Sequence, residues 1–94
     1  MIENLMDTYK RYPISFSKGE GSWLYDSDGR KYLDFAAGIA VNVLGHGHPK
    51  IKKVMHEAID NVWHVSNLYH IPEQQKLAKK LCDISFADKV FFCN

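Results

Sequence analysis

The chain has 94 residues, of which 46% are hydrophobic and 24% charged, a balance typical of a globular protein and unlike that of a disordered one. Its formal net charge of +1 gives no indication of nucleic-acid binding or of attraction to an anionic membrane. The sequence contains no apolar run of membrane-spanning length and does not begin like a secretory signal. We therefore expect a cytoplasmic protein in which Cys82 and Cys93 are buried, reduced thiols.

The first half of the chain is predicted to be mainly strands. Residues 2–10 are expected to form a short helix before them. Residues 15–35 then read as strands joined by turns. Gly19 and Gly21 permit a tight bend, and the "DSDG" stretch at 26–29 lies between two aromatic runs, which is typical of a hairpin turn.

The second half is predicted to contain two helices. Pro49 opens the first, over residues 49–62, because proline is favoured in the first turn of a helix. The second runs from Pro72 to residue 81 or 83, after an aromatic and polar loop at 63–70. Apolar side chains at helical spacing are expected to face inward: Ile51, Val54, Met55, Ala58, Ile59 and Val62 in the first helix, and Leu77, Ala78 and Leu81 in the second.

The chain ends with a short apolar run, Val90–Cys93. Such a run predicts a strand that is covered on both faces, as in a parallel sheet. Ligands of open α/β sheets bind just beyond the carboxyl ends of the strands. We therefore expect the chain to stop close to the place where a ligand site begins.

Five histidines raise the question of a metal site. His46 and His48 share one side if their segment is extended, but no HExxH motif or cysteine pair accompanies them, so no metal ligand is predicted. The alternative is that both hydrogen-bond to backbone in a loop bent by glycine. Gly38, Gly45 and Gly47 allow the backbone to pass close to another segment, a subunit or a ligand, and tight packing of the loop is an equal alternative.

The loop "WHVSNLYH" at residues 63–70 mixes aromatic, amide and imidazole groups. This mixture suits an interface or a pocket, and the alternative is a loop packed against its own domain. The chain contains no Ser-His-Asp arrangement that can be ordered, no phosphate loop and no Rossmann glycine fingerprint. The residues alone therefore indicate no reaction.

Three blocks occur in an order and at a spacing that resemble a known family: "KGEGSWLYDSDGRKYLDFAAGIAVNVLGHGHPKI", "WHVSN" and "FADKVFFCN". From Tyr9 to Asn94 the chain resembles the beginning of the acetylornithine group of class III pyridoxal-phosphate aminotransferases. The resemblance implies an α+β fragment. Residues 1–48 would form an amino-terminal hairpin lobe and glycine-rich loop, and residues 49–94 two amphipathic helices and the first strand of a fold-type-I α/β large domain.

The resemblance also implies roles for individual residues. Tyr9 matches a tyrosine near the substrate's entrance, although a mobile surface tyrosine is an equal alternative. Ile39 and Asn42 would bind substrate at the pocket wall, and Ser66 and Asn67 would lie near a dimer interface. The phosphate-binding turn, the acid that pairs with the pyridine nitrogen and the Schiff-base lysine would follow residue 94. No catalytic or cofactor-binding residue is therefore expected in this chain, which alone should be inactive.

The activity implied for the full enzyme is amino-group transfer between N-acetylornithine and 2-oxoglutarate in arginine biosynthesis, by a homodimer holding pyridoxal phosphate. Ornithine aminotransferases carry a tyrosine where this chain has Ile39, which argues against free ornithine as the substrate. The alternatives are a class III enzyme for succinyldiaminopimelate, ornithine or 4-aminobutyrate, a non-enzymatic interaction module, and a small metal-binding protein.

Overall fold

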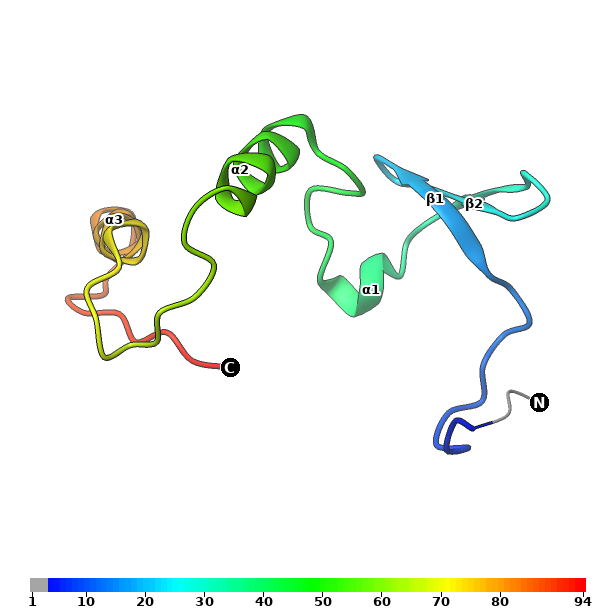
Figure 1. Ribbon diagram of the computed structural model, residues 1–94, viewed down its shortest axis with the longest axis horizontal. Coiled ribbons are helices and arrows are strands. Elements are labelled where there is room, and N and C mark those ends of the chain that lie inside the picture. Colours follow the sequence, from blue (N-terminus) through cyan, green and yellow to red (C-terminus); the bar gives the residue numbers. More distant parts are fainter. Residues whose placement is uncertain (1–3) are drawn as a thin grey trace. The chain divides into compact units, whose positions relative to one another are not determined.

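The computed structural model describes residues 4–94, and Figure 1 shows its helices and strands. The chain divides into two units, Met1–Glu57 and Ala58–Asn94. The division into 1–48 and 49–94 remains a prediction. The elements show an α+β segment, as expected. In chain order they are β1 (Phe16–Glu20), β2 (Trp23–Asp26), β3 (Lys31–Leu33), α1 (Ala37–Ala40), α2 (Pro49–Ile59) and α3 (Pro72–Asp83).

The first unit contains an antiparallel sheet in the order β1-β2-β3. Glu20 pairs with Trp23 across the first turn, where Gly21 has a φ of 58°. The second turn is the "DSDG" stretch, and Gly29 there has a φ of 81°. Both predicted turns are confirmed, because glycine at each supplies a positive φ that other residues rarely adopt.

After the sheet, α1 is a single turn of unusual hand. Ala37, Gly38, Ile39 and Ala40 have φ values of 49°, 64°, 64° and 58°, so the turn is left-handed. It is closed by backbone hydrogen bonds to the carbonyls of Ala36 and Ala37, including Val41 N–H to Ala37 O at 2.8 Å. Between β3 and α2 the described chain contains this single turn and no helix of ordinary length.

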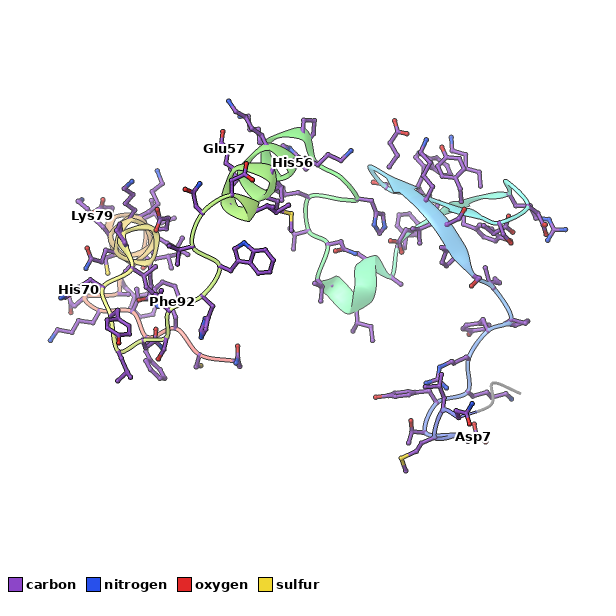
Figure 2. All side chains as sticks on the ribbon, in the orientation of Figure 1. Asp7, His56, Glu57, His70, Lys79 and Phe92 are labelled. Atoms are coloured by element: carbon purple, nitrogen blue, oxygen red, sulfur yellow. The ribbon has the colours of Figure 1, made fainter. Side chains whose placement is uncertain are left out.

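The two predicted helices are present, and Figure 2 shows His56 and Glu57 on α2 and Lys79 on α3. Both begin at the proline that the sequence indicated. α3 reaches Asp83, as expected, but α2 ends at Ile59 and not at residue 62. The indole Nε1–H of Trp63 donates to the carbonyl oxygen of Ile59 at 2.8 Å, which satisfies one of the acceptors that a helix end leaves free.

Two predicted elements are wrong. Residues 4–10 form turns and bends and no helix, and residues 2 and 3 lie outside the described part. Val90–Cys93 does not form a strand. A strand needs hydrogen bonds from a neighbouring strand, and the sheet of the described residues consists of β1, β2 and β3 alone.

The expected inward faces of the helices are not covered. Among residues 4–94 no apolar side chain is buried, and Val54, Met55 and Leu77 are 61%, 63% and 51% exposed. The thiols also differ from the expectation, since Cys82 is half-buried and Cys93 is exposed. Within the described part, no helix is long and apolar enough to cross a membrane.

Candidate functional site

The most buried polar residue described is Asp26, at the end of β2. Its Oδ1 accepts the backbone N–H groups of Asp28 at 3.0 Å and Arg30 at 2.8 Å, and its Oδ2 accepts the Tyr32 hydroxyl at 3.1 Å. Burial alone would raise the pKa of Asp26, but the hydrogen bonds from Arg30, Tyr32 and Asp28 outweigh it and lower the pKa. All of these partners lie within the hairpin, so the hydrogen bonds of Asp26 fix the turn.

A second buried carboxylate, Asp34, directly follows β3. Its Oδ1 accepts the backbone N–H of Ala37 at 2.9 Å, and its Oδ2 lies 2.7 Å from Nε2 of His46. The hydrogen bond from Ala37, followed by that from His46, lowers the pKa of Asp34, so this carboxylate is ionised near neutral pH. An ionised carboxylate only accepts hydrogen bonds, so Nε2 of His46 carries the proton.

The glycine-rich loop is attached to the first turn of the sheet. The backbones of Gly21 and His46 exchange hydrogen bonds of 2.9 and 2.7 Å. A Cβ on Gly45 would lie 2.6 Å from the carbonyl oxygen of Gly21, and one on Gly19 would lie 2.7 Å from Cγ of His46. Of the open alternatives for this loop, the structure shows close passage of the backbone to another segment of the same chain.

An open cavity of about 420 Å³ lies beside this loop in the first unit. Its lining includes Asn42, His46, His48, Lys52 and Met55. His48 Nδ1 accepts the backbone N–H of Lys50 at 3.2 Å, so the expected bond to backbone is confirmed for this histidine. It is wrong for the ring of His46, which bonds to a carboxylate.

The expected substrate residues fall in two places. Ile39 and Asn42 belong to one turn, Ile39 being 91% exposed and Asn42 half-buried beside Gly38. Tyr9 lies in the irregular segment before β1, 72% exposed, with the Arg11 guanidinium carbon 5.6 Å from its ring centre. Of the three residues, Ile39 and Asn42 therefore lie in the same turn, and Tyr9 lies in a separate segment.

Ser66 and Asn67 lie in the second unit, in the loop before α3. Ser66 has a φ of 70°, and its Oγ accepts the N–H of Leu68 at 3.4 Å. Asn67 Oδ1 accepts a hydrogen bond from Gln74 Nε2 at 3.1 Å. Both line an open cavity of about 550 Å³, together with His64 and the segment at 91–94. This segment contains Phe92, which is labelled in Figure 2.

Neither cavity fits pyridoxal phosphate on its own. The cofactor needs a lysine for its aldehyde and an acid for its pyridine nitrogen. The first cavity contains Lys52 but no carboxylate, and the second contains neither group. Both buried carboxylates, Asp26 and Asp34, are engaged by hydrogen bonds within their own unit. Residues 4–94 also contain no group of three or more His, Cys, Asp or Glu placed to hold a metal ion.

The pairing of Asp34 with His46 was missed by the sequence interpretation. The two residues are twelve positions apart, and the intervening loop conformation decides whether they meet. A signal was present: an aspartate directly after a strand, and a histidine flanked by glycines, are both unusual in apolar surroundings. This pattern does not show that Asp34 and His46 are partners, nor how far apart their side chains lie.

The comparisons with known proteins agree on one family. The class-III aminotransferase family matches residues 6–94. The acetylornithine aminotransferase of Agrobacterium fabrum is 56% identical over 90 residues, which are 96% of this chain and 23% of that protein. That of Rhodobacter capsulatus is 53% identical over 94 residues, 100% of this chain and 24% of that protein.

Solved structures show the same likeness. The N-acetylornithine aminotransferase from Stenotrophomonas maltophilia aligns with a TM-score of 0.80 at 36% identity, over 89% of this chain and 23% of that one. The acetylornithine aminotransferase from Elizabethkingia anophelis aligns with a TM-score of 0.83 at 26% identity, over 92% of this chain and 22% of that one.

The fold is thus that of the amino-terminal part of aminotransferase structures. The chain belongs to the class-III aminotransferase family. It spans about a quarter of the length of the curated relatives that it matches.

Proposed function

We propose that the chain is the amino-terminal segment of an acetylornithine aminotransferase. The complete protein would transfer an amino group from N-acetylornithine to 2-oxoglutarate in arginine biosynthesis. The observation that supports this most directly is the 56% identity to an acetylornithine aminotransferase over 96% of the chain. The exposed aliphatic side chain of Ile39 agrees with a neutral acyl group, since it offers no hydrogen bond to a free amine.

In this proposal the segment supplies part of the substrate-binding wall and not the reacting groups. Ile39 and Asn42 would face the amino donor from the left-handed turn, and Tyr9 would approach it from the segment before β1. Ser66 and Asn67 would lie at the interface of a cytoplasmic homodimer. These roles rest on the family resemblance and on the accessibility of Tyr9, Ile39 and Asn67.

Pyridoxal phosphate is the cofactor that the family implies, and it supplies the electron sink for removal of the substrate α-proton. We propose that residues outside this segment hold it, because neither cavity here combines a lysine with an acid. The run Val90–Cys93 would then pair with strands of a fold-type-I large domain. Pairing would shield the backbone beside Phe91, which is 85% exposed in this chain.

The test is an assay of the complete protein that carries this segment. With pyridoxal phosphate and 2-oxoglutarate present, N-acetylornithine is expected to give a higher kcat/KM than ornithine, 4-aminobutyrate or N-succinyldiaminopimelate. A preference for one of the latter three would overturn the proposed substrate and retain the family. The 94-residue chain alone, assayed in parallel, is expected to be inactive.

A further inference from the structure

Asp34 contacts three segments of the first unit. Its backbone N–H donates to the carbonyl of Ser22 at 2.8 Å, which ties it to the sheet. Its two carboxylate oxygens accept from Ala37 and from His46, at 2.9 and 2.7 Å. The Asp34 side chain is only 8% exposed and that of His46 21%. Asp34 is therefore a shielded junction between the sheet, the left-handed turn and the glycine-rich loop.

The left-handed turn requires such a restraint. Three of its four residues are not glycine, and L-residues disfavour this backbone region because Cβ approaches the following carbonyl oxygen. Strained backbone persists only where surrounding contacts determine it. The hydrogen bond from Ala37 to Asp34 is the side-chain contact at the point where the positive φ values begin.

The second hydrogen bond of Asp34, to His46, is also fixed by its surroundings. The ring of His46 packs against Gly19, where a Cβ would lie 2.7 Å from Cγ, and its backbone pairs with Gly21. The ring is thus fixed by the sheet before it reaches the carboxylate. Because Asp34 is bonded both to this ring and to the Ala37 N–H, it fixes the start of the turn relative to the sheet. The turn closes at Asn42, whose backbone N–H donates to Ala37 O at 2.9 Å.

We propose that Asp34 is a positioning residue for the amino donor: oriented by His46, it holds the left-handed turn that presents Ile39 and Asn42 to the substrate. This inference rests on the function proposed above. The proposal assigns Asp34 no contact with the substrate, because its side chain is 8% exposed and both of its oxygens accept hydrogen bonds within the unit.

Two substitutions test the hydrogen bonds of Asp34 with Ala37 and His46. In Asp34→Asn the carboxylate charge is lost, so neither link is charge-assisted any longer. One side-chain position also becomes an NH₂ donor, which can pair with His46 only if Nε2 gives up its proton and accepts. In His46→Phe, the ring still covers Gly19 but has no donor. His46→Gln keeps a donor near the position of Nε2 and serves as the conservative rescue. Asp28→Asn is the matched control, since Asp28 is a hairpin carboxylate whose side chain is 72% exposed.

The experiment measures two quantities in the complete protein. Hydrogen–deuterium exchange of the peptide covering residues 36–42 is expected to become about tenfold faster in Asp34→Asn and His46→Phe, the scale of one charge-assisted hydrogen bond. KM for N-acetylornithine is expected to rise about three- to tenfold while kcat changes less than about twofold. His46→Gln is expected to restore both quantities in part, and Asp28→Asn to change neither.

The outcomes separate this inference from the proposed function. Faster exchange throughout the sheet, or faster exchange at 36–42 with an unchanged KM in an active enzyme, would overturn the positioning role. A double variant, Asp34→Asn with His46→Phe, that is no worse than either single variant supports it, because both act through one linkage. Inactivity of the unsubstituted protein toward N-acetylornithine would overturn the proposed function. The exchange comparison needs no substrate and would still decide the linkage.

Discussion

Asp26 and Asp34 stabilise the sheet and its neighbouring loop only while they are ionised. Both carboxylates accept at least two hydrogen bonds, and the pKa of each is lowered below its ordinary value. A group whose pKa is lower in the folded than in the unfolded chain contributes stability above the unfolded pKa. That contribution disappears as the pH falls through the folded pKa, which places the loss in the range below about pH 4.

We therefore expect the β2–β3 hairpin to open on acidification below about pH 4 while it stays closed between pH 5 and 8. The fluorescence of Trp23, recorded in a Trp63→Phe background, follows the transition because Trp23 lies on β2. Asp26→Asn is expected to open the hairpin already at neutral pH. Asp28→Asn is the control with an exposed carboxylate, and an identical acid transition in both variants would contradict the assignment to Asp26.

For individual residues, the sequence predicted the two turns of the sheet but not the side chains that fix them. Gly21 and Gly29 indicated both turns, because positive φ is a local property of the residue. The bond from Tyr32 to Asp26 crosses the hairpin and depends on its register. Such a partner becomes visible only when the fold is known.

The left-handed turn α1 is the most strained element of the first unit. Ile39 is β-branched and has φ 64° and ψ 62°, a conformation that costs about 1–2 kcal/mol for an L-residue. Val41, two residues later, has an ordinary φ of −94°. Both side chains are largely exposed, at 91% and 72%. The two positions therefore differ in backbone conformation more than in packing.

We predict that glycine is tolerated better at position 39 than at position 41. Ile39→Gly relieves the strain and Val41→Gly does not, while both raise the entropy of the unfolded chain similarly. The free energy of local opening at the Asn42 amide, measured by hydrogen exchange, is expected to be about 1–2 kcal/mol higher in Ile39→Gly than in Val41→Gly. Equal values would show that the turn stores no strain at Ile39.

The end of α2 depends on a side chain from outside the helix. Trp63 donates its indole N–H to the carbonyl of Ile59, although the tryptophan itself is 81% exposed. We expect Trp63→Phe to reduce the free energy of opening of the last turn of α2 by about 0.5–1.5 kcal/mol, the net value of one hydrogen bond. Amide exchange in that turn measures it, and Val62→Ala, at a similarly exposed neighbour, is the control. The same loss in both variants would contradict the capping role.

Element prediction succeeded where the signal is local. The prolines at 49 and 72 and the apolar periodicity gave the starts of α2 and α3 correctly. The predicted strand at Val90–Cys93 failed because a strand is defined by its partner, and apolar residues alone do not supply one. The hand of α1 was not predicted, because nothing in "AAGIA" other than the glycine indicates positive φ.

Taken as a whole, the described chain has apolar surface but no apolar core. No hydrophobic side chain of residues 4–94 is buried, and Phe35, Phe86 and Phe91 are 90%, 100% and 85% exposed. Hydrophobic burial is the main favourable contribution to folding. Helices of the length of α2 are marginal without tertiary packing, so the isolated chain is not expected to be rigid.

We predict that the 94-residue chain, studied alone, self-associates or is only partly ordered. It is expected to become monodisperse when the rest of the aminotransferase is supplied, because exposed apolar faces and the unpaired segment at 90–93 would then be covered. Sedimentation velocity and amide exchange decide it. A sharp monomer with slowly exchanging amides at Val90–Phe92 would contradict the prediction and support a self-sufficient domain.

The contact between Gly45 and Gly21 limits how this sequence can vary. Gly45 and Gly29 have similar φ values, 78° and 81°, but a Cβ at residue 45 would meet a carbonyl oxygen, whereas nothing lies within 4 Å of Gly29. In a saturation library, position 29 should therefore admit asparagine or aspartate, the residues that tolerate this backbone best. Position 45 should admit glycine alone, so that each new side chain there is removed by selection for folding and not by selection for catalysis.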